Sequence, residues 1–262
     1  MSKFCVIGGG RQGTAIAYDL LKFGNPSQVI IADVDLKQAE ASTAKNKSLL
    51  NTDKLLAVQV DVNDQKQMLE LLQDMDVLIS AVPYHLNTKV TDFAIQSSTS
   101  MVDLGGHTGI VQAQLNRSHE AIEKGITIVP DCGMGPGMNV TMALLAMEQL
   151  DTPEHVRIWD GGLPLNPVDP WNYASFFNIN GLTNEYDGDA FFIRDGNVIE
   201  VPCFEDVEVL SFGDEIGDLE AAVTSGGLST MPWTFEGKLK PLENKTLRYF
   251  GHWNQMIAFR QL

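Results

Sequence analysis

Residues 3–13 read Lys-Phe-Cys-Val-Ile-Gly-Gly-Gly-Arg-Gln-Gly, and this stretch decides the fold of the N-terminal half. A short apolar run leads into Gly8-x-Gly10-x-x-Gly13, which opens a segment with helical periodicity. In such a strand–turn–helix, Gly8 makes the tight turn, Gly10 lets a pyrophosphate approach the backbone, and Gly13 lets helix and strand pack closely. The pyrophosphate would bind the N–H groups at the helix N-terminus, so Arg11 and Gln12 join the predicted cofactor-binding turn.

A second apolar run, residues 29–32, is followed by Asp33, about 20 residues beyond the last glycine. A carboxylate at this position accepts hydrogen bonds from the ribose hydroxyls of an adenosine and repels a 2′-phosphate. The pattern therefore predicts an NAD site and disfavours NADP. The alternative interpretation is a glycine turn that binds no ligand.

The chain has 262 residues, of which 44% are hydrophobic, enough for two domains with sizeable cores. Its net charge of -16 argues against nucleic acid or an anionic membrane surface as a partner, and favours either a cationic substrate or simple solvation. The three cysteines and five histidines show neither metal-ligand spacing nor a disulfide framework. Unpaired thiols and short apolar runs predict a cytoplasmic protein with no membrane span, and we expect no signal peptide.

Short β-branched runs alternate with helical periodicity along residues 1–150. This alternation predicts an α/β fold with right-handed crossovers and a doubly wound parallel sheet, the Rossmann fold. The expected strands are 3–7, 28–32, 55–60, 76–80, 99–103 and 126–129, and the expected helices are 11–24, 35–48, 64–74, 86–97, 112–124 and 137–150.

The pattern changes after residue 150, where strand-like pieces separated by turns replace the long helical periodicity. They predict a second, mainly antiparallel α+β domain over 151–262. Residues 255–262 are apolar and strand-like, so we expect a sheet that stops mid-course and a chain truncated at its C-terminus. The strand-like pieces are 156–159, 190–193, 198–201, 207–210 and 245–249.

In a doubly wound sheet the ligand lies outside the carboxyl ends of the strands, which selects the loops to inspect. Asp61 follows the third expected strand, where it and Val62 either contact adenine or make a strand-end turn. The small residues and proline after the fourth strand leave room for the cofactor between adenosine and nicotinamide. These residues are Ser80, Ala81, Val82 and Pro83.

Asp103 and His107 follow the fifth expected strand. An acid ahead of two glycines is suitably placed to face a substrate, and an imidazole with a pKa of about 6.5 suits proton transfer near neutral pH. The alternative is that Asp103 caps the turn and His107 lies in solvent.

In the second domain, Thr224 and Ser225 precede two glycines, and their hydroxyls offer a polar clamp. Residues 245–252 alternate like a strand, which places Arg248 on the same face as Thr246. Arg248 either binds a carboxylate through its guanidinium fork or lies at a surface or an interface.

The chain resembles the saccharopine dehydrogenase superfamily from residue 3 to about residue 253, and within it looks most like the NAD-dependent L-lysine 6-dehydrogenases. This resemblance implies a cofactor domain followed by an α+β domain that binds substrate and forms homo-oligomer contacts. It also implies that Arg248 anchors a substrate carboxylate, that residues 224–227 form the substrate-side clamp, and that related chains continue well beyond residue 262. The motifs that carry the resemblance are Gly8–Gly13, 32–35, 102–107, 130–131, 135–138, 161–164, 224–227, 245–249 and 251–252.

The activity implied by the resemblance is an oxidation in which NAD accepts hydride from the carbon that bears the side-chain amine of L-lysine or a related amino acid. Hydrolysis of the imine then gives 2-aminoadipate 6-semialdehyde. Because a lysine ammonium has a pKa of about 10.4, a base must remove its proton, and Asp103 or His107 would serve. Two alternatives stay open: an NAD(P)H-dependent reductive condensation of the saccharopine or carboxynorspermidine type, and a non-catalytic NAD-binding sensor.

Overall fold

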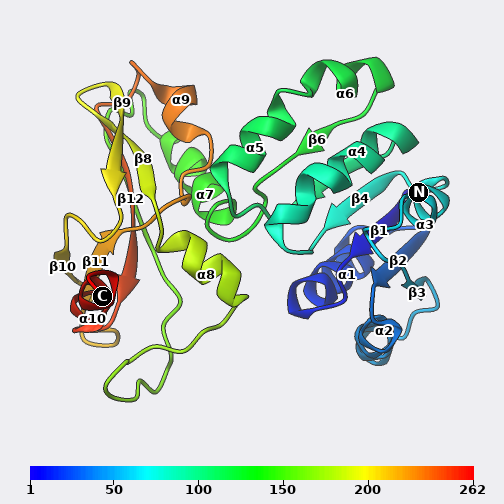
Figure 1. Ribbon diagram of the computed structural model, residues 1–262, viewed down its shortest axis with the longest axis horizontal. Helices are drawn as coiled ribbons and strands as arrows, with labels where there is room; N and C mark the ends of the chain where they lie inside the picture. Colours follow the sequence, from blue (N-terminus) through cyan, green and yellow to red (C-terminus); the bar gives the residue numbers. More distant parts are fainter. The chain divides into compact units, whose positions relative to one another are not determined.

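Strand β1 (Lys3–Ile7) lies inside a six-stranded parallel sheet of the computed structural model, which describes residues 1–262. The strand order is β3-β2-β1-β4-β5-β6, so the sheet is doubly wound about β1 and β4 as the sequence predicts; Figure 1 labels every strand of this order except β5. The remaining strands are β2 (Gln28–Asp33), β3 (Leu55–Gln59), β4 (Val77–Ser80), β5 (Ser100–Asp103) and β6 (Ile128–Val129).

Both faces of this sheet are buried, because successive strand residues point to opposite sides and helices cover each side. Cys5 and Ile7 pack in a core completed by helices α3 (Gln65–Leu72) and α4 (Asn87–Ser97). Val6, between them, packs in a second core completed by helices α1 (Arg11–Phe23) and α2 (Leu36–Leu50). This two-sided burial explains why the strands read as continuous apolar runs.

The helix expected over 112–124 is two helices, α5 (Thr108–Leu115) and α6 (Ser118–Lys124). Arg117 separates them, with φ −96° and ψ 11°, outside the helical region. Its guanidinium binds Glu120 at 2.7 Å and also pairs with Asp92. A short 3-10 helix, η1 (Tyr84–Leu86), precedes α4.

The second sheet has the order β10-β11-β12-β8-β9 with antiparallel neighbours, and these five strands are labelled in Figure 1. Strand β7 pairs parallel with β12. Its mainly antiparallel character confirms the predicted fold class. The strands are β7 (Val156–Asp160), β8 (Asp189–Arg194), β9 (Asn197–Pro202), β10 (Glu208–Ser211), β11 (Asp218–Val223) and β12 (Pro241–Arg248). The helices are α7 (Met138–Met147), α8 (Ile179–Glu185), α9 (Met231–Phe235) and α10 (His252–Arg260).

The chain divides into two units between Cys132 and Gly133, whereas the sequence pattern predicts a boundary at residue 150. Helix α7 accounts for the difference. Its residues Val140, Ala143 and Met147 pack against the core of the second sheet, so the helix belongs to the second unit.

The C-terminal segment is helix α10, and the expectation of a strand over 255–262 is wrong. Trp253, at the start of this helix, is fully buried in a cluster with Phe204 and Ala222. Its indole N–H donates to the carbonyl of Glu220 at 3.1 Å. Strand β11, which carries Glu220 and Ala222, was not expected, because its run Leu-Glu-Ala-Ala is rich in residues that favour helices.

The packing of α1 on β1 depends on Gly13, which is buried at their contact. A Cβ atom at position 13 would lie 1.8 Å from the carbonyl oxygen of Gly8. At position 10, by contrast, a Cβ atom would meet no atom within 4 Å.

We therefore expect Gly13→Ala to destabilise the first unit by about 3 kcal/mol, because the helix must shift away from the strand. The matched control Gly10→Ala should leave the unfolding midpoint within error of the wild type. All four tryptophans lie in residues 133–262, so far-UV circular dichroism reports both units while tryptophan fluorescence reports the second alone. Equal midpoints for the two variants would contradict the close-packing role of Gly13.

Candidate functional site

The glycine turn leaves open backbone where a ligand would approach. Gly10 is exposed and is the N-cap of α1, and no side chain caps this end of the helix. The first-turn N–H groups of an α-helix have no acceptor within the helix and carry a partial positive charge. The turn thus has the surface and the polarity that a pyrophosphate requires.

Asp33 closes the turn from the end of β2. Its Oδ2 accepts a hydrogen bond from the N–H of Gly9 at 2.7 Å, and its Oδ1 accepts one from the N–H of Asp35 at 2.9 Å. No Lys or Arg forms an ion pair with Asp33 or Asp35. The negative charge at the end of β2 is therefore not neutralised by a basic side chain that would receive a phosphate.

Residues in the loops after β3 and β4 form hydrogen bonds and packing contacts with the protein itself. Asp61 Oδ1 accepts a hydrogen bond from the N–H of Asn63 at 2.8 Å, which is the strand-end turn, and Val62 is packed in the first core.

In the loop after β4, the fully buried hydroxyl of Ser80 donates to Asn87 Oδ1 at 2.8 Å. Ala81 passes beside Gly8, with its carbonyl oxygen 2.6 Å from the position of a Cβ atom there, while Val82 is partly buried and Pro83 is exposed.

The Asp103 side chain is enclosed by groups of the protein. Its side chain is fully buried, and its oxygens accept hydrogen bonds from Gly105 N at 2.7 Å, Asp131 N at 3.2 Å and Gln114 Nε2 at 2.7 Å. Burial raises the pKa of the Asp103 carboxyl, and these hydrogen bonds oppose that rise. This geometry matches the interpretation in which Asp103 holds the turn.

His107 remains accessible at the start of α5. Its ring stacks on that of Tyr84, with centroids 5.6 Å apart and an interplanar angle of 17°. The stack joins the loops after β4 and β5, at the edge of the sheet where a doubly wound fold binds its ligand.

In the second unit, Arg248 is buried to 2% exposure inside a protein network. Its Nε donates to Tyr186 Oη at 3.0 Å, its Nη1 to the carbonyl of Leu247 at 2.9 Å, and its Nη2 to Glu185 Oε1 at 3.3 Å. The guanidinium carbon also lies 4.8 Å from the centre of the Tyr173 ring. Arg248 thus has an internal carboxylate partner, and a ligand carboxylate would have to compete with Glu185.

Thr224 and Ser225 join the same network. The hydroxyls of Thr224 and Thr246 lie 2.7 Å apart, and Thr246 Oγ1 donates to Glu185 Oε1 at 3.1 Å. Ser225 Oγ donates to the carbonyl of Asn184 at 2.6 Å. The predicted clamp and the predicted anchor are therefore linked through Glu185, a residue that sequence reasoning missed.

The electrostatics of this network favour neutral groups. Burial raises the pKa of Glu185 although Arg248 opposes the rise. Burial, reinforced by Arg248, lowers the pKa of His252 to about 4. His252 Nε2 lies 2.8 Å from the hydroxyl of Tyr186, so a neutral imidazole completes the surroundings of Arg248.

A second missed group lies at the end of β7. Asp160 contacts Asn139 and Asn244 through its side-chain oxygens, and burial raises the pKa of its carboxyl. The signal in the sequence was Asp160 itself, which directly precedes Gly161 and Gly162 at a strand end.

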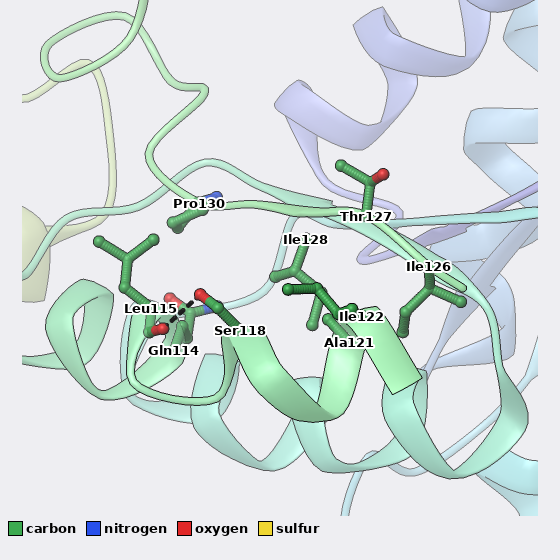
Figure 2. Close-up of a pocket in the computed structure, with 9 residues that line it drawn as sticks. All are labelled: Gln114, Leu115, Ser118, Ala121, Ile122, Ile126, Thr127, Ile128 and Pro130. Carbon is green, nitrogen blue, oxygen red and sulfur yellow. Dashed lines mark hydrogen bonds between the residues drawn. The ribbon is translucent and has the colours of Figure 1, made fainter. Parts of the chain in front are cut away.

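A hollow of about 180 Å³ lies beside the edge strand β6 (Figure 2). None of its lining residues belongs to the predicted cofactor or catalytic set. They are Gln114, Leu115, Ser118, Ala121, Ile122, Ile126, Thr127, Ile128 and Pro130.

No three His, Cys, Asp or Glu side chains in the chain lie close enough together to hold a metal ion. No helix combines the length and apolar character needed to cross a bilayer.

The low pKa of His252 predicts an acid-sensitive second unit. The folded state binds this proton only near pH 4, whereas the unfolded state binds it near pH 6.5, so stability is full above pH 6.5 and is lost as pH falls toward 4. The loss attributable to His252 amounts to about 3 kcal/mol at most. Urea unfolding followed by tryptophan fluorescence should show a flatter pH dependence in His252→Gln than in wild type. His155→Gln, at an exposed position of the same unit, should follow the wild type, and parallel curves for all three proteins would refute the assignment.

Comparison with known proteins agrees with both units. A saccharopine dehydrogenase NADP binding domain matches residues 4–129, and a saccharopine dehydrogenase C-terminal domain matches residues 133–262. Saccharopine dehydrogenase [NADP(+), L-glutamate-forming] of Saccharomyces cerevisiae is 26% identical over 182 residues, covering 67% of this chain and 40% of the relative. Mitochondrial alpha-aminoadipic semialdehyde synthase of Rattus norvegicus is 27% identical over 210 residues, covering 76% of this chain and 21% of the relative.

The chain thus spans less than half the length of these two relatives. The structure of apo saccharopine dehydrogenase (L-Glu forming) from Saccharomyces cerevisiae superposes with a TM-score of 0.78 at 20% identity, over 99% of this chain and 58% of that one. That superposition shows a shared fold. Because the two domain models together cover nearly every residue, the chain belongs to the saccharopine dehydrogenase family.

Proposed function

We propose that this chain carries the activity of an NAD-dependent oxidoreductase that oxidises the side-chain amine of L-lysine or of a lysine derivative. The family membership supports the reaction class, and the single observation that supports NAD is the carboxylate of Asp33 at the end of β2, which accepts backbone hydrogen bonds and has no Lys or Arg partner. The product of lysine oxidation would be 2-aminoadipate 6-semialdehyde after the imine hydrolyses.

The residues of the first unit fit a dinucleotide. The open backbone at Gly10 and the N-terminus of α1, with Arg11 and Gln12, would hold the pyrophosphate. Asp33 would accept hydrogen bonds from the adenosine ribose, and Asp35 beside it adds a second negative charge against a 2′-phosphate. When bound, NAD supplies the hydride acceptor, and the protein supplies position and charge.

The second unit supplies groups suited to an amino acid. Arg248 offers a planar guanidinium whose carboxylate partner, Glu185, has a pKa raised by burial. A substrate carboxylate that replaces Glu185 would leave that glutamate protonated, which keeps the local charge balanced. Thr224 and Thr246 would then orient the substrate through their paired hydroxyls.

A proton must leave the substrate ammonium before the neighbouring carbon can give up hydride. Of the two bases considered from the sequence, the accessible ring of His107 suits this step, since Asp103 is enclosed by three donors. We assign the proton-accepting role to His107 as part of the proposal.

A second candidate substrate is saccharopine, whose nitrogen joins carbon 6 of a lysine skeleton to a glutarate. The name of the yeast relative, together with both domain matches, favours it. It needs room for further carboxylates, and the same C–N bond is oxidised or, in reverse, formed by reductive condensation.

The proposed reaction predicts that the purified protein reduces NAD+ when L-lysine or saccharopine is supplied, read as absorbance at 340 nm. The faster of the two substrates then identifies the reaction. NAD+ binding without turnover of either substrate would instead support a dinucleotide sensor. His107→Gln should lower kcat while leaving the affinity for NAD+ unchanged, since its role is in the proton transfer.

The cofactor assignment predicts that wild-type protein binds NAD+ at least tenfold more tightly than NADP+ by calorimetry. Asp33→Asn removes the charge and should weaken NAD+ binding about tenfold, because charge-assisted hydrogen bonds to the ribose are lost. Asp74→Asn, at an exposed position after α3, is the matched control and should bind both dinucleotides as wild type does. Tighter binding of NADP+ than of NAD+ by wild type would overturn the assignment.

A further inference from the structure

Asp160 occupies a distinctive position on the second sheet. It is the last residue of β7, and its register partner on the parallel neighbour β12 is Thr246. Paired residues on adjacent strands point to one face, and so do residues two apart along a strand. Asp160 therefore shares a sheet face with Asn244, Thr246 and Arg248, of which Thr246 and Arg248 belong to the proposed substrate site.

The carboxylate of Asp160 is held by neutral amides. Its Oδ2 lies 3.0 Å from Asn139 Nδ2, and its Oδ1 lies 3.4 Å from Asn244 Nδ2. Asn139 is itself fixed, because its Nδ2 also donates to the carbonyl of Gly227 at 3.0 Å and its Oδ1 accepts from the N–H of Val140 at 2.7 Å. The amide groups hold the carboxylate in place without neutralising it.

No cation forms an ion pair with Asp160. The charged groups that act on it are Arg248, which favours its ionised form, and Glu185, a carboxyl of the same sign. Arg248 is already hydrogen-bonded to Glu185. A partly buried carboxylate without a counterion is costly, and such groups are concentrated at functional sites.

The carboxylate also lacks a covering side chain on the side of the turn before α7. The neighbour there is Gly135, where a Cβ atom would lie 2.6 Å from Asp160 Oδ2. A glycine at this position, with Gly161 following in the chain, keeps the carboxylate free of the side chains that a larger residue would place against it.

We propose, resting on the proposed function, that Asp160 recognises the side-chain ammonium group of the substrate. The amides of Asn139 and Asn244 orient its oxygens, and the ammonium supplies the missing positive charge. Asp160 then binds the side-chain ammonium of a basic amino acid, and Arg248, on the same sheet face, binds its carboxylate. The residue thereby selects cationic substrates over neutral ones of the same length.

The test compares L-lysine with L-norleucine, which has the same carbon chain and no side-chain amine. Binding of each to the full chain saturated with NADH, which cannot accept a hydride, is measured by calorimetry. We expect wild type to prefer L-lysine, and Asp160→Asn to lose at least tenfold of that preference while its affinity for L-norleucine is unchanged. Asp160→Glu, which keeps the charge, should retain a measurable part of the preference. Asp151→Asn, exposed in the same unit, is the control and should match wild type.

A structural role alone would not move the ratio of the two affinities, and tryptophan fluorescence checks that each variant is folded. An Asp160→Asn protein that keeps the wild-type preference overturns the inference, and so does a wild type that binds both amino acids equally. The proposed function is judged separately, by turnover of L-lysine or saccharopine in wild type. Turnover with an unchanged preference in Asp160→Asn would sink the role of Asp160 alone.

Discussion

The contact between Gly13 and the carbonyl of Gly8 is the constraint on which the first unit depends. It brings helix α1 against strand β1 more closely than any side chain permits, and so fixes where the helix begins. The exposed N-terminus of α1 then lies at the carboxyl end of the strand, next to Asp33. The positive end of the helix and a fixed carboxylate therefore lie next to each other. They complement the negative pyrophosphate and the hydroxyl donors of the ribose in a dinucleotide.

The second unit differs from the first because it buries charged groups beside its sheet. Arg248 is satisfied by a carboxylate, a phenol and a backbone carbonyl, and aromatic rings surround its plane. Burial keeps His252 neutral next to it and raises the pKa of Glu185. The network therefore holds a guanidinium beside a carboxyl whose pKa is raised, and the proposed exchange of Glu185 for a substrate carboxylate rests on this arrangement.

The sequence alone predicts the strands and most of the helices of the first unit, because the signals there are local. Each strand is a short apolar run, and each helix has its own periodicity. The glycine spacing indicates a contact between residues only five positions apart, Gly8 and Gly13. The second unit is less readable. Strand β11 has the composition of a helix, and helix α7 follows the first unit in sequence although it packs on the second sheet.

The candidate site shows a more basic limit. Arg248, Thr224 and Ser225 were identified as polar groups in need of partners, yet a sequence does not tell whether a partner is a ligand or another part of the chain. Here Glu185, Thr246 and Asn184 fill that role. The sequence does not reveal the hydrogen bonds that hold Asp160, because Asn139, Asp160 and Asn244 lie far apart in the chain and meet only in the folded protein.

The division between the two units after Cys132 has a consequence for how such a chain arises. The two family domains meet at the same place, with the first ending at residue 129 and the second starting at residue 133. A genetic exchange at this junction would cut neither a strand nor a helix and would leave each hydrophobic core whole. Under the proposed function, the cofactor-binding part and the substrate-binding part of the chain are therefore separable at a single loop.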